Sequence, residues 1–169
     1  GSVLDLGAGS GVWGIALAQA SPQVTVTAVD WPAVLEVTRK MAERCGVGAQ
    51  LRYVEGDLFA ADFGTGRQVA TIGHILHAVG ARQSLVLLRK TFEALAPGGT
   101  VAIAEFLVNE QRTAPAAGLI FAVNMLVNTV EGDTFSFEEI REWLLEAGFV
   151  NPRTLDTPGP SPLVLGTKP

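Results

Sequence analysis

Short apolar runs alternate with longer stretches of helical spacing along most of the chain. The short runs are rich in Val, Leu and Ile and predict strands at residues 3–6, 24–29, 51–54, 69–72 and 101–108. Between them, apolar residues recur at helical spacing and predict helices at about residues 12–20, 32–45 and 81–95. This alternation is typical of an α/β fold, in which a doubly wound, mostly parallel sheet carries helices on both faces.

The last third of the chain has a different rhythm. Two helices are predicted in succession, at about 115–129 and 137–147, and Ser136 with Glu139 predicts a capping box at the start of the second. Strands at 149–156 and 163–166 then flank a proline-rich turn at 157–162, which predicts a terminal hairpin. The pattern contains no repeat, low-complexity tract or linker, so we interpret residues 1–169 as one domain.

Composition narrows the classes of function. The chain is 48% hydrophobic and 17% charged, which excludes a disordered protein. Its longest apolar run, at 118–127, contains Asn124 and is too short to cross a bilayer, so no membrane association is expected. The net charge of −5 comes without a basic block, which disfavours nucleic acid as a partner.

Two further features concern location and surface. The single cysteine, Cys45, excludes an internal disulfide and a cysteine-based zinc site, and it is compatible with a reducing compartment. The first residues have no signal-peptide pattern, so we expect a cytoplasmic protein. The mean hydropathy of +0.32 is high, and the charged fraction lies below the usual value of about 25%. Some apolar surface is therefore expected to pack against a partner.

A glycine-rich turn and two aspartates predict a nucleotide-sized pocket. Gly7, Gly9 and Gly11 follow the first predicted strand, and glycine lets a backbone approach a ligand closely. Asp30 ends the second strand, where it can accept both ribose hydroxyls, and Asp57 follows the third, where it can accept an adenine amino group. Individually, such turns often only join elements, and such aspartates often cap helices. Their order along one sheet favours a binding site.

The identity of the nucleotide depends on the register of the glycines. Residues 9–14 match the dinucleotide pattern G-x-G-x-x-G. In a dinucleotide site, however, the first glycine directly follows the strand, and here that residue is Gly7; counted from Gly7, the pattern ends at Val12. The register therefore argues against NAD, and an NAD-dependent oxidoreductase remains a distant alternative.

Several segments together resemble one enzyme family. Residues 3–11, Val-Leu-Asp-Leu-Gly-Ala-Gly-Ser-Gly, resemble motif I of the class I S-adenosylmethionine-dependent methyltransferases. Further segments follow the pattern of the small-molecule O-methyltransferases related to caffeate, flavonoid, acetylserotonin and bacterial polyketide-tailoring enzymes, namely 28–32, 56–59, 75–77, 95–99, 104–105 and 144–149. The resemblance implies a seven-stranded sheet whose last strand is antiparallel. It also implies S-adenosylmethionine as cofactor, with S-adenosylhomocysteine as product, bound by Asp5, Gly7, Gly9, Gly11, Asp30, Trp31, Asp57 and Leu58.

The resemblance also implies a catalytic group. His77 matches the general-base histidine of the family, which takes the proton of the acceptor hydroxyl in a reaction that requires no metal. Glu105 matches a carboxylate beside that base, and Asp133 lies near a second one. His74 precedes His77 by one helical turn and could line the acceptor pocket if this stretch is helical. The alternative for His77 is a partly buried structural histidine.

The acceptor side departs from the family pattern at two points. Ala78, Val79 and Gly80 stand where acids usually follow the base, and Gly73 occupies the position of a lysine. A C-methyltransferase, or a nucleoside-binding module without methyl transfer, therefore stays open. The helix at 115–129 is the acceptor-lining helix of the family, and its candidate substrate-binding residues are Phe121, Asn124, Met125 and Asn128. Core packing is an equally good interpretation of these residues.

The resemblance covers only part of a typical family member. Members are about twice this length and carry an N-terminal helical domain that dimerises and roofs the substrate site. We therefore interpret residues 1–169 as the catalytic domain, without that dimerisation domain. The expected protein is an S-adenosylmethionine-dependent O-methyltransferase that acts on a small aromatic or polyketide-like acceptor. We expect the complete protein to be a homodimer, and apolar surface to be exposed where the other domain packs.

Overall fold

A single seven-stranded sheet organises the chain. The computed structural model describes residues 1–159 and 161–169, and the strand order is β3-β2-β1-β4-β5-β7-β6. The strands are β1 (Ser2–Leu6), β2 (Thr25–Asp30), β3 (Leu51–Glu55), β4 (Arg67–Gly73), β5 (Leu95–Ala104), β6 (Val150–Leu155) and β7 (Leu163–Thr167). Pairs among β1 to β5 are parallel, while β7 runs antiparallel to both β5 and β6. The predicted α/β class, seven strands and antiparallel terminal hairpin are confirmed.

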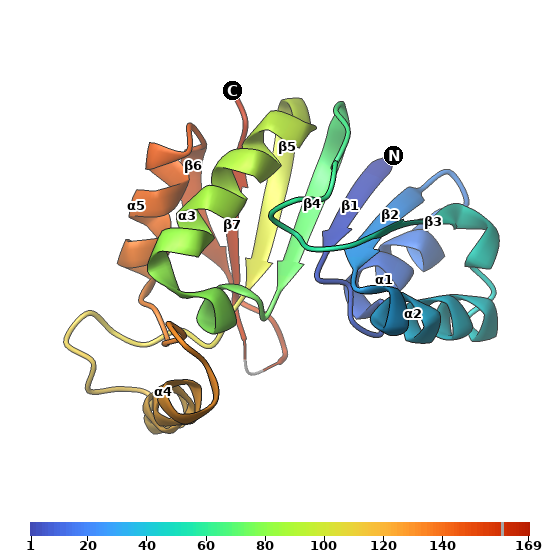
Figure 1. Ribbon diagram of the computed structural model, residues 1–169. Helices are drawn as coiled ribbons and strands as arrows, with labels where there is room; N and C mark the ends of the chain where they lie inside the picture. The colour runs from blue at the N-terminus through green and yellow to red at the C-terminus, as the bar shows by residue number, and fades with distance from the viewer. Residues whose placement is uncertain (160) are drawn as a thin grey trace.

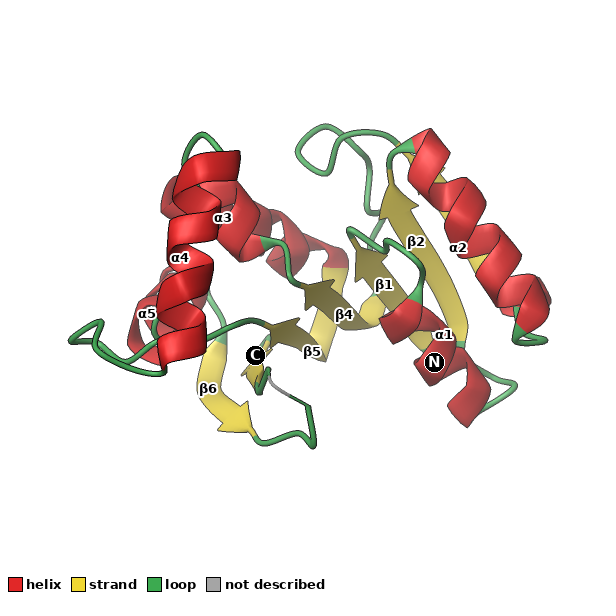
Figure 2. Ribbon diagram, turned by 90° about the horizontal axis from the view of Figure 1, so that it is seen from below, coloured by secondary structure: helices red, strands yellow, loops and turns green. Residues whose placement is uncertain are grey.

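Helices cover both faces of this sheet (Figures 1 and 2). The helices are α1 (Val12–Ala20), α2 (Pro32–Arg44), α3 (Leu76–Ala94), α4 (Ala116–Asn128) and α5 (Phe137–Glu146), and a short 3₁₀ turn, Gly48–Gln50, precedes β3. Helices α1 and α2 pack on the β1–β3 part of one face, and α3 and α5 pack on the opposite face. Within the residues that the structure describes, no helix is both long and apolar enough to cross a membrane.

The core forms where the sheet meets α3 and α5. Leu4, Ile72 and Ile103 from the sheet are fully buried against Leu88 of α3 and Leu144 of α5. The predicted capping box starts α5: the Ser136 side chain accepts the N–H of Glu139, and the Glu139 side chain accepts the N–H of Ser136. The predicted turn at 157–162 includes residue 160, which lies outside the described residues.

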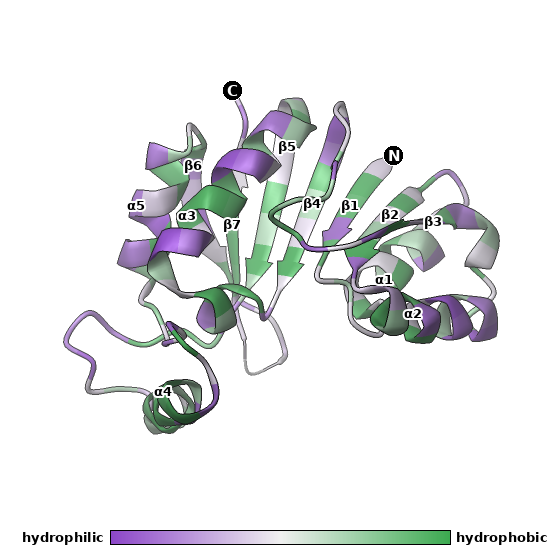
Figure 3. Cartoon of the chain, viewed as in Figure 1, coloured by the Kyte–Doolittle hydropathy of each residue, from purple (hydrophilic) through white to green (hydrophobic). Residues whose placement is uncertain are grey.

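Helix α4 differs from the other helices in position. It stands apart below the carboxyl ends of the strands (Figure 1), and its apolar character extends around the helix (Figure 3). Only Gly118 and Met125 of α4 are buried. Its large exposed apolar residues are Ile120, Val123, Leu126 and Val127. The apolar surface that the composition predicts is therefore concentrated on this helix.

Two predicted boundaries are wrong. The apolar pattern predicts the fifth strand at 101–108, but the strand is Leu95–Ala104, because the chain after Ala104 leaves the sheet and Val108 makes only an isolated bridge to Ser136. The pattern predicts the third long helix from about residue 81, but α3 starts at Leu76. The predicted start falls just after Gly80, which has a non-helical conformation (φ 79°, ψ 170°) inside α3. The short segment before this kink contains His77.

Candidate functional site

The glycine turn follows β1 with left-handed backbone angles. Gly7, Gly9 and Gly11 have φ values of 64°, 57° and 83°, a region that favours glycine. A Cβ on Gly7 would collide with the side chain of Ile75, whereas a Cβ on Gly9 would meet nothing closer than 4.0 Å. The first glycine therefore allows the turn to pack, and the second leaves open space for a ligand.

Asp5 supports this turn from below. Its carboxylate is buried and accepts hydrogen bonds from the Gly14 N–H at 3.0 Å and from the Thr71 hydroxyl at 2.7 Å. Burial raises the pKa of Asp5 to about 6, although these two hydrogen bonds oppose the shift. The carboxylate thus joins β1, β4 and α1 beneath the turn, and the predicted contact of Asp5 with the cofactor stays a prediction.

Beside the turn lies a pocket of about 280 Å³ at the carboxyl ends of β1 to β4. Five of the predicted cofactor residues line it, namely Gly7, Asp30, Trp31, Asp57 and Leu58, and the others in its wall are Gly56, Phe59, Ile75, Ala78 and Val79. Gly9 contacts the pocket indirectly, because its N–H donates to Asp30. Gly11 lies at the start of α1. The structure thus brings the dispersed sequence motifs together in one place.

The two aspartates of the pocket are held by backbone donors. Asp30 accepts the N–H of Gly9 at 2.9 Å and the N–H of Trp31 at 2.7 Å, one on each oxygen. Asp57 accepts the N–H of Phe59 at 2.9 Å. A carboxylate has about four lone-pair positions, so both side chains keep capacity for the hydroxyl or amino donors of a ligand. With Trp31 57% exposed at the rim, the site suits a nucleoside.

His77 and Glu105 form a buried pair next to this pocket. His77 lies in the first turn of α3, and Glu105 directly follows β5. The His77 Nδ1 is 2.7 Å from one Glu105 oxygen, and the His77 backbone N–H donates to the other at 3.3 Å. A carboxylate in this position favours the tautomer with the proton on Nδ1. The Nε2 lone pair of the imidazole is then available to accept a proton.

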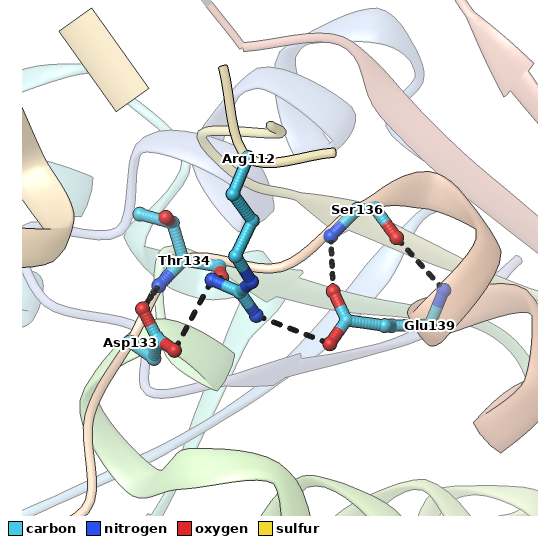
Figure 4. Close-up of polar contacts among 5 residues, drawn as sticks. All are labelled: Arg112, Asp133, Thr134, Ser136 and Glu139. Atoms are coloured by element: carbon cyan, nitrogen blue, oxygen red, sulfur yellow. Dashed lines mark hydrogen bonds and ion pairs between the residues drawn. The ribbon is translucent and has the colours of Figure 1, made fainter. Parts of the chain in front are cut away.

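Asp133 contacts His77 through its backbone and Arg112 through its side chain. Its backbone N–H donates to the His77 carbonyl at 2.9 Å, but its carboxylate pairs with Arg112 at 3.2 Å (Figure 4). Arg112 also contacts the Thr134 carbonyl at 2.9 Å and the Glu139 carboxylate at 3.2 Å. The Asp133 carboxylate thus joins an ion-pair cluster that ties the loop after β5 to the start of α5, and its predicted place beside the base stays a prediction.

An aromatic cluster lies beside the histidine. The Phe121 ring of α4 meets the His77 ring edge-on, with centroids 4.8 Å apart, and is 4.7 Å from Phe106. The His74 ring is 4.8 Å from Phe106 and 6.0 Å from His77. Phe106 is not among the predicted site residues, although its position next to Glu105 was an available signal. His74 is not helical, because it has φ 58° and its N–H donates to the Ala104 carbonyl at 2.9 Å.

The other predicted acceptor residues of α4 are less directly placed. Met125 is buried, which agrees with the core interpretation. Asn124 and Asn128 are exposed and bond to each other, with 2.6 Å between the Asn128 Nδ2 and the Asn124 Oδ1. Among the predicted acceptor residues of α4, Phe121 is thus the one for which the described part of the structure shows a contact with the His77 ring.

The missing lysine at position 73 has a steric explanation. A Cβ on Gly73 would collide with the indole nitrogen of Trp13 from α1. The Trp13 side chain therefore takes the space that a side chain at position 73 would need.

Comparisons with known proteins agree with this geometry. The family model of the O-methyltransferase domain matches residues 1–150. The tetracenomycin polyketide synthesis 8-O-methyl transferase TcmO of Streptomyces glaucescens is 32% identical over 168 residues, which are 99% of this chain and 49% of that protein. The chain thus spans about half the length of the curated relatives it matches.

Solved structures extend the similarity to the whole fold. An O-methyltransferase family 2 protein from Planctomyces limnophilus, solved in complex with apigenin, is 27% identical with a TM-score of 0.93, over 99% of this chain and 50% of that one. PigF, known from Serratia sp. and solved with SAH, is 30% identical with a TM-score of 0.88, over the same shares. The family match, the relatives and the fold agree, and this chain belongs to the S-adenosylmethionine-dependent O-methyltransferase family.

Proposed function

We propose that this chain is the catalytic domain of an enzyme that transfers a methyl group from S-adenosylmethionine to a hydroxyl of a small aromatic or polyketide-like molecule, with His77 as general base. One observation carries the proposal. The buried His77–Glu105 pair adjoins the nucleoside pocket, because Ile75 and Ala78, on either side of His77, line that pocket. A base beside a nucleoside site suits methyl transfer to a hydroxyl, because the hydroxyl loses its proton as its oxygen is methylated.

The pocket residues would hold the cofactor through its nucleoside. Asp30 would accept the ribose hydroxyls, Asp57 the adenine amino group, and Trp31 would cover the adenosine from the rim. The cofactor, when bound, supplies a methyl group on a positively charged sulfur, which is open to attack by an oxygen nucleophile. Gly9 leaves room for the rest of the cofactor because its position has no side chain.

His77 would act on the acceptor. Its Nε2 would accept the hydroxyl proton as the oxygen–carbon bond forms and the sulfur–methyl bond breaks, with S-adenosylhomocysteine as the leaving group. The Glu105 carboxylate would stabilise the imidazolium that results. Such general-base catalysis typically contributes about 10²–10⁴ in rate. Phe106, Phe121 and His74 offer ring surfaces beside the base, and an aromatic acceptor would stack against them. The apigenin complex of the Planctomyces relative supports this class of acceptor.

The rest of the protein would complete the acceptor side. Relatives are about twice as long as this chain, and α4, whose Phe121 contacts His77, exposes Leu126 and Val127. We infer that further chain covers α4, and that the complete protein dimerises through it. A C-methyltransferase or a nucleoside-binding module remains the alternative, because Ala78 follows the base where family members usually have an acid.

Two measurements test the proposal. Calorimetric titration should show that S-adenosylhomocysteine binds the domain while NADH does not; the opposite preference would refute the cofactor assignment. The complete protein should then be incubated with S-adenosylmethionine and a panel of phenols and naphthols, with products identified by mass spectrometry and NMR. Methyl groups on oxygen support the proposal. Methyl groups on carbon, or cofactor binding without any product, would favour one of the alternatives.

A further inference from the structure

His74, His77 and Glu105 bring three metal-ligating side chains together. One ligand atom from each lies within 4.8 Å of the other two, and this is the only such group of three or more among the residues that the structure describes. His74 directly follows β4, His77 lies in the first turn of α3, and Glu105 directly follows β5. Three separate elements thus converge at one point.

His74 has an unexplained feature in this cluster. Its Nδ1 is buried, yet it has no hydrogen-bond partner in the described part of the chain. Burial lowers the pKa of His74, and the nearby Glu105 charge opposes this effect. A buried nitrogen without a partner costs free energy, and a ligand that binds it would remove that cost.

We propose that His74, His77 and Glu105 form a binding site for a divalent transition-metal ion of the Zn²⁺ type, and that an ion bound there blocks methyl transfer by occupying the base. The blocking part of this inference rests on the proposed function. The binding part rests on the geometry alone.

The donor set suits such an ion. Two imidazoles and one carboxylate are a common zinc set, and they leave a fourth position open for water. The Glu105 carboxylate adds a negative charge to the donor set, and a negative charge attracts a divalent cation. Tetrahedral zinc with bonds of about 2.0–2.2 Å needs donors roughly 3.4 Å apart. His74 must therefore move inward, and its ring packs against Phe106 while its Nδ1 has no hydrogen-bond partner in the described part of the chain. The 2.7 Å contact between His77 and Glu105 must open slightly as the ion replaces the shared proton.

A bound ion and the general base exclude each other for a chemical reason. A neutral imidazole has one nitrogen lone pair, and its other nitrogen carries a proton. An ion held together with Glu105 binds Nδ1 of His77, because this nitrogen faces that carboxylate. The proton then moves to Nε2, which can no longer accept one. His77 therefore cannot take the hydroxyl proton, while the aspartates of the cofactor pocket remain untouched.

The binding test uses metal ions alone, in a Cys45→Ser background that removes the one thiol of the chain. Calorimetry should show one Zn²⁺ per chain, and Co²⁺ should develop the visible absorption bands of a tetrahedral site. We expect His74→Gln and Glu105→Gln to weaken Zn²⁺ binding at least tenfold, by roughly the loss known for disturbed metal sites. The matched control Glu110→Gln, an exposed carboxylate outside the cluster, should leave Zn²⁺ affinity unchanged. Equal Zn²⁺ affinity in the background and in His74→Gln would overturn the proposal.

The activity test follows in the complete protein, with each variant compared to its own metal-free rate. Zn²⁺ should inhibit methyl transfer, a chelator should restore it, and the remaining turnover of His74→Gln should need at least tenfold more Zn²⁺ for half inhibition. Affinity for S-adenosylhomocysteine should stay within about twofold when Zn²⁺ is present. Zn²⁺ bound at these residues with turnover unaffected would overturn the exclusion of the base. If the protein transfers no methyl group at all, the binding test still decides the site.

Discussion

At the carboxyl edge of the sheet, the β1–β3 side and the β4–β5 side differ in how much of their surface this chain itself covers. On the β1–β3 side, donors of this chain already hold the two carboxylates at the glycine turn. Asp5 accepts hydrogen bonds from the Gly14 N–H and the Thr71 hydroxyl, and Asp30 accepts two backbone N–H groups. On the β4–β5 side, the His77–Glu105 pair is buried, but the neighbouring α4 leaves most of its apolar surface in solvent.

This difference separates two functions that the complete enzyme would combine. The nucleoside pocket is formed by residues between Gly7 and Val79 and needs nothing from α4. The acceptor side involves α4 through Phe121 and includes its exposed surface. We therefore expect cofactor binding to be a property of the domain alone, while turnover depends on what covers α4.

The largest expected effect separates chemistry from binding. In the complete protein, His77→Gln should lower turnover by roughly 10²–10⁴-fold, the usual contribution of a general base, while affinity for S-adenosylhomocysteine stays within about twofold. Glu105→Gln should lose less, because the imidazole remains but its tautomer is no longer held. The double variant should have about the same turnover as His77→Gln alone, because the two residues act as one unit and their effects do not multiply.

A structural role for His77 makes the opposite prediction. Its replacement would lower the melting temperature and weaken cofactor binding together, and turnover would fall only with the folded fraction. Circular dichroism melts, calorimetry and steady-state kinetics on the same preparations distinguish the two cases.

The next effect tests the cofactor side alone. Asp30→Ala should weaken binding of S-adenosylhomocysteine to the isolated domain by about 1.5–3 kcal/mol, or roughly 10–150-fold, because charge-assisted hydrogen bonds to the ribose are lost. Asp62→Ala is the matched control, since Asp62 also accepts a backbone N–H, that of Gly64, but lies outside the pocket. Unchanged affinity in Asp30→Ala, measured by calorimetry, would remove this residue from the site.

A smaller effect concerns the support beneath the turn. The pKa of Asp5 is about 6 in the folded domain, against an ordinary value of 3.8 for an aspartate in the unfolded chain, so between these values the folded state binds more protons than the unfolded one. The contribution of Asp5 to stability should therefore fall as pH rises from about 4 to 6, by at most about 1.4 kcal/mol per pH unit. Asp5→Asn should remove this slope in urea unfolding. If both proteins show the same slope, Asp5 titrates alike in the two states.

The smallest expected effect concerns the open side. The isolated domain should self-associate and bind a hydrophobic dye, because α4 exposes Leu126 and Val127. Leu126→Lys with Val127→Lys should reduce both signals in light scattering and dye fluorescence, and cofactor affinity should not change. A wild-type domain that is monomeric and binds no dye would argue against an uncovered interface on α4.

The sequence alone determined the features that depend on local order. Alternating strands and helices, the glycines after β1 and the aspartates at the ends of successive strands were readable, because periodicity and turn chemistry act over a few residues. Parallel strands then bring their carboxyl ends to one edge, so the pocket residues could be grouped before any contact was known. The partners Glu105 and His77 came from the family resemblance rather than from local pattern.

Tertiary structure decided the features that depend on contacts between side chains far apart in sequence. Asp5 turned out to lie under the turn because Thr71 and Gly14 take its oxygens, and the Asp133 carboxylate was taken by Arg112 from another loop. The indole of Trp13 filled the space at position 73. His74 lies outside α3, and its N–H donates to the Ala104 carbonyl of the neighbouring strand β5. The packing of segments far apart in sequence determines which polar groups pair and which side chain fills a given space. The periodicity of apolar residues reports only on neighbours along the chain, so it cannot predict these contacts.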